Sequence, residues 1–239
     1  MLQQTQVERV VPKWQSFLED FPTPADCATA SLGDVLRRWQ GLGYPRRARN
    51  LHAAAAVVTE RHEGRLPDTL DELLALPGIG PYTARAVLAF AFERDVAVVD
   101  TNIARILARA LGERLTPKRA QAAADALVPV GEGWTWNQVV MDLGAMVCRP
   151  TPRCDVCPIA VSCVWCRAGC PTPDPAVGSA GVSAKQPPFE GSDRQRRGRV
   201  LAALAQGARP TIDFDERIVA GLVADGLIER RGTQLSLPT

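Results

Sequence analysis

A short glycine-rich turn between two predicted helices constrains this sequence more than any other feature. The segment 76–84 reads Leu-Pro-Gly-Ile-Gly-Pro-Tyr-Thr-Ala, and an alanine-rich helical stretch follows it. Gly78 and Gly80 have no side chains, so their backbone amides can approach a ligand closely. The first amides and the dipole of the following helix favour an anion at the same place. We therefore predict a hairpin that binds a phosphate group; the alternative is a plain glycine-rich connector.

Four cysteines in a short proline-rich stretch are the second constraint: Cys148, Cys154, Cys157 and Cys163. The two middle ones are spaced i, i+3, which commonly places two thiolates on one ion or cluster. We expect these four to bind a 4Fe-4S cluster. The rival is a zinc site made by Cys154, Cys157, Cys163 and Cys166. Its central loop, 158–162, is far shorter than the roughly 15–20 residues usual between the cysteine pairs of such zinc sites.

Composition agrees with a cytoplasmic globular protein. The 239 residues are 46% hydrophobic and 23% charged, with a net charge of +2. We expect no signal peptide and no membrane partner, because no basic start followed by an apolar core and no run of about 18 apolar residues occurs. Cysteines in the cytoplasm serve as metal ligands more often than as disulfides. Arginines gather at 46–49 and 194–199, where the plainest explanation is a solvated helix face.

The spacing of apolar residues predicts an all-α body. Apolar positions recur at three- and four-residue steps, and Gly- and Pro-rich turns separate the segments. The predicted helices cover 2–20, 31–40, 46–63, 69–75, 81–92, 101–112, 117–129 and 134–147. Residues 171–190 have the composition of a linker. Residues 191–239, with two helices and a hairpin around Gly232, show a weak similarity to a winged-helix fragment.

Asp100 stands directly before the predicted helix 101–112. Aspartate is favoured as the N-cap of a helix, so a structural role is sufficient to explain it. Because it follows the hairpin glycines in the chain, we also expect its carboxylate to face the ligand that they bind. The two roles are compatible.

Hairpin, Asp100 and cysteine loop follow one another in the order found in the endonuclease III superfamily of base-excision glycosylases, which this chain resembles. Further segments are similar to the adenine DNA glycosylases (the MutY family). They are 1–7 (Met-Leu-Gln-Gln-Thr-Gln-Val), 41–44 (Gly-Leu-Gly-Tyr), 48–51 (Ala-Arg-Asn-Leu) and 141–145 (Met-Asp-Leu-Gly-Ala). The resemblance covers residues 1 to about 165. It implies an all-α helix-hairpin-helix DNA glycosylase fold with an iron-sulfur cluster loop, followed by a small winged-helix-like tail.

We therefore expect four parts in the chain. These are a helix-hairpin-helix glycosylase domain at 1–147 (hairpin 76–84), the cluster loop at 148–170, a linker at 171–190 and the C-terminal unit at 191–239.

The resemblance also implies an activity. Members of the family flip adenine out of mispairs with 8-oxoguanine or guanine and hydrolyse its N-glycosidic bond. The implied partner is double-stranded DNA containing adenine:8-oxoguanine or adenine:guanine mispairs, bound by a monomer in the cytoplasm at the nucleoid. Two alternatives stay open: a pyrimidine or thymine mismatch glycosylase on the same scaffold, and a non-catalytic DNA-binding iron-sulfur protein.

Individual roles follow from the same resemblance. Asp100 would stabilise the positive charge that develops on the sugar, and Asn102 would arrange water and the aspartate. Tyr82 stands where bifunctional relatives carry a lysine that forms a Schiff base, so it implies a monofunctional enzyme. The implied DNA-binding residues are Gln4, Thr5, Tyr44, Arg49, Gly78 and Gly80. Gln4 and Tyr44 would enter the base stack, and Thr5 would lie near the 8-oxoguanine.

Three departures from the family pattern affect these expectations. The interval between Cys148 and Cys154 is one residue shorter than usual, and Cys166 and Cys170 are additional thiols that could replace a ligand. The C-terminal unit is too short for the MutT-like domain that reads 8-oxoguanine. The family's catalytic glutamate lies just before the position that matches Met1. We therefore expect a chain truncated at its N-terminus relative to the family, which as given excises adenine poorly.

Overall fold

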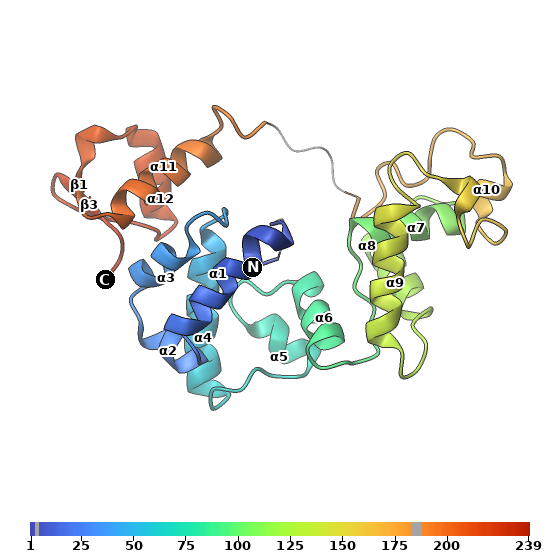
Figure 1. Ribbon diagram of the computed structural model, residues 1–239, viewed down its shortest axis with the longest axis horizontal. Helices are drawn as coiled ribbons and strands as arrows, with labels where there is room; N and C mark the ends of the chain where they lie inside the picture. The colour runs from blue at the N-terminus through green and yellow to red at the C-terminus, as the bar shows by residue number, and fades with distance from the viewer. Residues whose placement is uncertain (3–4, 183–187) are drawn as a thin grey trace. The chain divides into compact units, whose positions relative to one another are not determined.

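The computed structural model describes residues 1–2, 5–182 and 188–239, and these are mostly helical (Figure 1). The expected all-α class is confirmed. By contact the chain divides into two compact units. Unit 1 comprises Met1–Pro67, Ala75–Gly78 and Gln186–Thr239, and unit 2 comprises Asp68–Leu74 and Ile79–Lys185. None of the described helices is long and apolar enough to span a membrane.

Four helices form the N-terminal part of unit 1: α1 (Val7–Asp20), α2 (Pro24–Thr29), α3 (Leu32–Trp39) and α4 (Arg46–Arg61). Helix α2 was not expected, because its Thr-Pro start reads as a turn. The structure shows why a helix forms there. Thr23 accepts a hydrogen bond from the Asp26 amide at 3.2 Å, and the Asp26 carboxylate accepts one from the Thr23 amide at 3.0 Å. This reciprocal capping box, with Pro24 at the first helical position, starts the helix.

The C-terminal part of unit 1 contains α11 (Asp193–Ala205), the 3₁₀ turn η2 (Thr211–Asp213) and α12 (Glu216–Ala224). A small antiparallel sheet of β1 (Arg209–Pro210), β2 (Glu229–Arg231) and β3 (Gln234–Ser236) has the order β1-β3-β2. Helices followed by a short antiparallel hairpin match the expected winged-helix-like arrangement. This segment and the N-terminal helices share one hydrophobic core. The domain boundaries expected from the sequence stay predictions.

Unit 2 contains α5 (Leu70–Ala75), which ends at the border with unit 1, α6 (Pro81–Phe90), α7 (Thr101–Leu111), α8 (Pro117–Asp125) and α9 (Gly133–Met146). The 3₁₀ turn η1 (Cys154–Val156) and α10 (Val164–Arg167) follow in the cysteine loop. Apolar residues of α7 and α8 form its core with Leu115. Residues 174–182, within the predicted linker, belong to this unit and bond to its other segments: the Ala180 amide donates to the Leu115 carbonyl at 2.9 Å, and Thr101 donates to the Gly181 carbonyl at 2.7 Å.

Candidate active site and cysteine centre

The glycine-rich turn starts α6 as expected. Gly78 has φ +74°, a left-handed conformation that glycine adopts without strain. A Cβ there would also collide with Asn50, so the position requires glycine. Gly80 is the N-cap of α6 with Pro81 at the first helical position, and a Cβ at Gly80 would meet open space. An open surface beside a helix start is what a phosphate site needs.

Asp100 is the N-cap of α7. Its Oδ1 accepts a hydrogen bond from the Ile103 amide at 2.7 Å, which fixes the carboxylate at the start of the helix. Burial raises the pKa of Asp100 above its usual range, and hydrogen bonds from the Ile103 and Asn102 amides oppose this shift. Burial also raises the pKa of Tyr82, and the negative charge of Asp100 adds to that shift. Tyr82, in the first turn of α6, and Asp100 therefore lie within electrostatic reach of each other.

A buried asparagine positions the segment that leads to Asp100. Asn137 on α9 is fully buried, and its Oδ1 accepts from the Val98 amide at 2.8 Å. Its Nδ2 donates to the carbonyls of Val96 at 2.9 Å and Gly133 at 2.7 Å. The extended run 96–99 has no neighbouring strand among the described residues, so this amide satisfies backbone groups that a sheet would otherwise pair.

Asn102 is held by a buried arginine. Arg105 is 5% exposed and donates to Asn102 Oδ1 at 2.8 Å. The same guanidinium donates to the carbonyls of Gly144 at 2.7 Å and Cys148 at 2.6 Å. A Cβ at Gly144 would lie 2.5 Å from the Asn102 Cβ, so α9 approaches α7 closely only because of this glycine. One side chain thus connects the start of α7 with the first cysteine of the loop.

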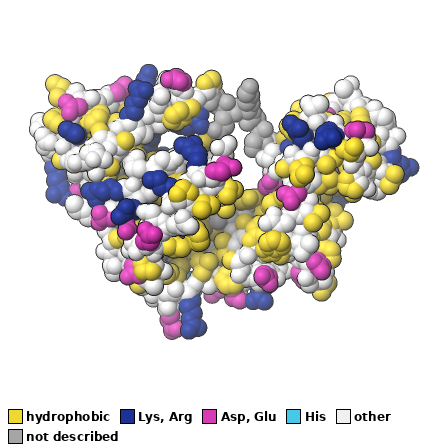
Figure 2. Space-filling model, in the orientation of Figure 1, with side chains coloured by type: hydrophobic (Ala, Val, Ile, Leu, Met, Phe, Trp, Pro, Cys, Tyr) yellow, Lys and Arg dark blue, Asp and Glu magenta, His cyan; other side chains and the backbone are white. Residues whose placement is uncertain are grey.

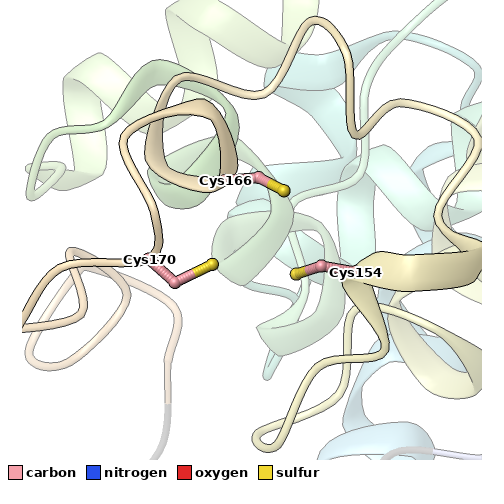
Figure 3. Close-up of side chains that lie close together, drawn as sticks. All are labelled: Cys154, Cys166 and Cys170. Atoms are coloured by element: carbon pink, nitrogen blue, oxygen red, sulfur yellow. The ribbon is translucent and has the colours of Figure 1, made fainter.

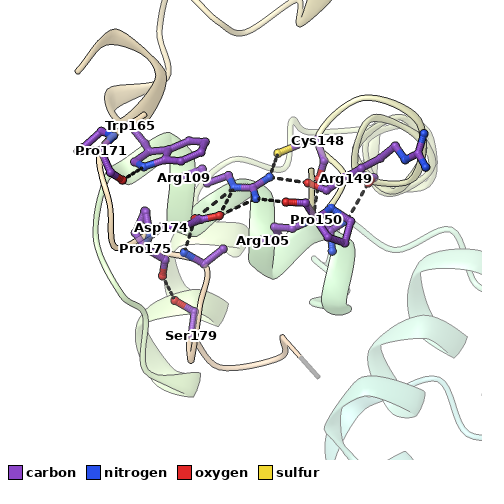
Figure 4. A network of polar contacts seen from close by, with 12 residues as sticks. Arg105, Arg109, Cys148, Arg149, Pro150, Trp165, Pro171, Asp174, Pro175 and Ser179 are labelled. Carbon is purple, nitrogen blue, oxygen red and sulfur yellow. Dashed lines mark hydrogen bonds and ion pairs between the residues drawn. The ribbon is translucent and has the colours of Figure 1, made fainter. Parts of the chain in front are cut away.

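A second buried arginine holds the cysteine loop (Figure 4). Arg109 is 2% exposed and donates to Cys148 Sγ at 3.4 Å, to the Arg149 carbonyl at 2.7 Å and to the Pro150 carbonyl at 3.0 Å. It forms an ion pair with Asp174 at 2.6 Å and lies over the Trp165 ring at 5.0 Å from the centroid. Helix α7 therefore anchors the loop through a charged group that is fully paired.

The cysteines converge on one cavity in unit 2. Cys148, Cys154, Cys157, Cys163 and Cys166 all line it. The thiols that point toward one another in Figure 3 are those of Cys154, Cys166 and Cys170, whose sulfur atoms lie within 4.8 Å of one another. Burial and the neighbouring thiols raise the pKa of Cys154 to about 12, so a metal has to displace its proton. The site fits a group that takes several thiolates, and it includes the two additional thiols noted in the sequence.

The predicted DNA-binding residues Thr5, Tyr44 and Arg49 lie in unit 1, and Gln4 lies outside the described residues. The Thr5 hydroxyl donates to the Leu42 carbonyl and accepts from Arg47, both at 3.1 Å. Arg47 also lies 5.5 Å from the centroid of the Tyr44 ring. Tyr44 has φ +47°, unusual for a residue with a side chain. Arg49 donates to the Asp225 carbonyl in the C-terminal segment.

Comparisons with known proteins decide the family. Residues 1–130 match the HhH-GPD superfamily of base excision DNA repair proteins. The chain is 39% identical over 249 residues to the adenine DNA glycosylase of Mycobacterium tuberculosis (strain H37Rv), covering 96% of this chain and 80% of the relative. This chain belongs to the adenine DNA glycosylase family. The expected family and its enzyme class, hydrolysis of N-glycosyl bonds, are confirmed.

Another curated relative supports the family of this glycosylase, and two solved structures support its fold. The human adenine DNA glycosylase is 40% identical over 171 residues, covering 68% of this chain and 31% of the human protein. A thermostable thymine-DNA glycosylase has a TM-score of 0.66 at 29% identity, over 70% of this chain and 80% of that one. A trapped endonuclease III–DNA covalent intermediate has a TM-score of 0.62 at 25% identity, with the same coverage. The helix-hairpin-helix glycosylase fold is thus confirmed.

Sequence reasoning missed several residues that build this glycosylase's site. The predicted helices 101–112 and 134–147 contain Arg105, Arg109 and Asn137, and the predicted linker 171–190 contains Asp174, but the sequence analysis assigns none of them a role. The helical repeat places Arg105 and Arg109 on the buried face of their helix, and a charged residue at such a position is the one local signal that could have identified them. Their partners lie far along the chain, and no local pattern identifies them.

Proposed function

We propose that this protein is a monofunctional glycosylase that removes adenine mispaired with 8-oxoguanine or guanine from double-stranded DNA. The observation that carries the proposal is Asp100, held at the N-terminus of α7 within electrostatic reach of a tyrosine. The names of the relatives support adenine as the base. We also propose that the protein acts as a monomer in the cytoplasm, at the nucleoid.

Asp100 would act by its charge. Cleavage of an N-glycosidic bond builds positive charge on the sugar, and a fixed carboxylate nearby stabilises that charge. The Ile103 amide holds the Asp100 carboxylate, so no reorganisation is needed at the moment of reaction. Asn102, fixed by Arg105, would orient water next to it. Tyr82 has no amine and cannot form a Schiff base with the opened sugar.

The proposed cofactor is a 4Fe-4S cluster bound by Cys148, Cys154, Cys157 and Cys163. All four line the cavity described above, and Cys166 or Cys170 could replace one of them. When bound, such a cluster holds its four thiolates together and so fixes the loop. Arg109 contributes a hydrogen bond to the Cys148 sulfur, of the kind that tunes iron-sulfur sites.

DNA would be bound mainly through its phosphates. The amides around Gly78 and Gly80 offer one such contact. Arg49 lies on α4 in unit 1, which also contains Tyr44 and Thr5. Figure 2 shows Lys and Arg side chains dispersed among acidic and apolar ones on the face drawn, so a charged stripe does not by itself mark the site.

Binding to uncleavable duplexes tests the proposed substrate. A 2′-fluoro substituent destabilises the sugar cation and stops cleavage, so the assay measures binding affinity alone. We expect 2′-fluoroadenosine opposite 8-oxoguanine to bind at least about tenfold more tightly than 2′-fluorothymidine opposite guanine, since one wrong pair costs roughly 1–3 kcal/mol. Tighter binding of the thymine duplex would favour the mismatch thymine glycosylase instead.

A lysine at position 82 should add lyase chemistry. Tyr82 is 43% exposed at the start of α6, so a lysine side chain fits there. We expect Tyr82→Lys to form a covalent adduct with a duplex containing a preformed abasic site when borohydride is added, because its amine attacks the opened sugar. Tyr82→Phe is the matched control and should trap no DNA. Efficient trapping by the unmutated protein would contradict the monofunctional assignment.

A further inference from the structure

Two segments far apart in the sequence meet in unit 1. Thr5 lies near the start of the chain, and the turn 41–44, which ends at Tyr44, leads into α4. The Thr5 hydroxyl donates to the Leu42 carbonyl at 3.1 Å, so the first segment is bonded to the backbone of the second. The two residues that are proposed to lie near the 8-oxoguanine and in the base stack therefore come from segments that contact each other.

Arg47, in the first turn of α4, bonds to both segments. Its Nη2 donates to the Thr5 hydroxyl at 3.1 Å and to the carbonyls of Leu42 at 2.9 Å and Gly43 at 3.2 Å. Its Nη1 donates to the Met1 carbonyl at 3.1 Å. A guanidinium is planar and carries its N–H donors in a fixed fork, so it holds these acceptors in one arrangement relative to one another.

Two aromatic rings lie near the same guanidinium. The Cζ of Arg47 lies 5.4 Å from the centroid of the Trp39 ring and 5.5 Å from that of the Tyr44 ring, and such contacts attract a cation to the ring. Trp39 is buried, and its indole Nε1 donates to the Gly43 carbonyl at 3.0 Å. Arg47 therefore connects a buried residue of the core of unit 1 with Tyr44.

The turn before α4 needs this support from other segments. Gly43 and Tyr44 are consecutive residues with positive φ, +72° and +47°. A left-handed conformation is unfavourable for a residue with a side chain, and it persists only where the surrounding structure fixes it. The bonds from Arg47 to the carbonyls of Leu42 and Gly43 fix it here. Without them we expect the turn to relax, and the ring of Tyr44 moves with its backbone.

We propose that Arg47 is a positioning residue, which holds Thr5 and Tyr44 in the arrangement with which this protein distinguishes 8-oxoguanine from guanine opposite adenine. The inference rests on the proposed function, in which Thr5 lies near the 8-oxoguanine and Tyr44 enters the base stack. Arg47 acts through the positions of these two residues and needs no contact of its own with DNA. Its loss should therefore lower the selectivity between the two opposite bases, and not only the stability of unit 1.

The test measures the affinity of the full chain for 2′-fluoroadenosine opposite 8-oxoguanine and opposite guanine, and compares the ratio of the two between variants. Both affinities fall equally when part of the protein is unfolded, so a merely structural role leaves the ratio unchanged. The unmutated protein should prefer the 8-oxoguanine duplex by at least about tenfold. Arg47→Met should lower this preference about fivefold to tenfold, as expected for a displaced hydrogen-bonding group. Arg47→Lys keeps the charge beside the rings but not the fork, and should stay folded and lose most of the preference.

Arg61→Met is the matched control. It removes an exposed arginine from the last turn of the same helix and should keep the full preference. A lower melting temperature of Arg47→Met with an unchanged ratio would overturn the inference, because Arg47 would then serve the fold alone. Full preference in a folded Arg47→Lys would overturn it as well, since the fork would not matter. If the unmutated protein binds both duplexes equally, the proposed reading of 8-oxoguanine fails, which is a different result from a failure of Arg47 to support it.

Discussion

Replacing Asp100 with Asn is expected to remove most of the protein's affinity for a duplex that carries a cationic pyrrolidine in place of the sugar. The pyrrolidine nitrogen imitates the charge of the transition state, and the side chain of Asp100 is held in place for that charge by the Ile103 amide. Loss of one fixed electrostatic contact typically costs about 10²–10³-fold. Asparagine keeps an oxygen that can cap α7, so the fold should be retained.

The comparison with an uncharged sugar isolates the charge. Asp100→Asn should change the affinity for a tetrahydrofuran duplex by less than about threefold, since that contact does not depend on charge. Asp71→Asn, at an exposed position of α5, is the matched control and should bind both duplexes normally. In the unmutated protein the preference for pyrrolidine should fall as pH drops through the raised pKa of Asp100, because the protonated acid is neutral. Equal losses on both duplexes would mean that Asp100 serves folding alone.

Replacing Arg109 with Met should destabilise unit 2 and prevent the cysteine centre from retaining its iron. The change removes a side chain that is 3% exposed and leaves Asp174 without its ion-pair partner. It also leaves the Arg149 and Pro150 carbonyls without this donor. Breaking a buried pair on one side costs about 3–5 kcal/mol. Urea unfolding should show that loss, and the purified variant should contain little iron.

Metal analysis makes this prediction specific. The unmutated protein should carry about four irons per chain, little zinc and a yellow-brown colour. Arg167→Met, at an exposed position of α10 near the cysteines, is the control and should keep both iron and stability. Stoichiometric zinc without a visible absorption band would refute the 4Fe-4S proposal. Arg109→Met with unchanged iron and unfolding would refute the anchoring role of Arg109.

The features that the sequence predicted well are those with local causes. The conformation of the turn at Gly78 and Gly80 is determined by the residues of the turn itself. The cap at Asp100 involves the amide of Ile103, within the first turn of the helix that it caps. Helix α2 was missed for a local reason too, since Pro24 can either end a turn or begin a helix. The capping partner Asp26 decides between them.

The features that the sequence did not predict depend on distant partners. Arg105 reaches Cys148, and Arg109 reaches Asp174, each through the packing of α7 against later segments. Asp225 likewise forms an ion pair with Arg46 only because the C-terminal segment and the N-terminal helices share one hydrophobic core. Composition marked residues 171–190 as a linker, yet Asp174 within it makes an ion pair with a buried arginine. Such pairings follow from tertiary packing, which local patterns do not encode.

Identification of the released base tests the central claim most directly. Excess protein is incubated for a long period with duplexes containing adenine:8-oxoguanine, adenine:guanine, thymine:guanine and uracil:guanine pairs, and free bases are measured by chromatography. Our account predicts that adenine is the base released, from the 8-oxoguanine and guanine mispairs, that Asp100→Asn abolishes its release, and that the strand stays intact until alkali is added. Release of thymine or uracil with adenine left in place would contradict it.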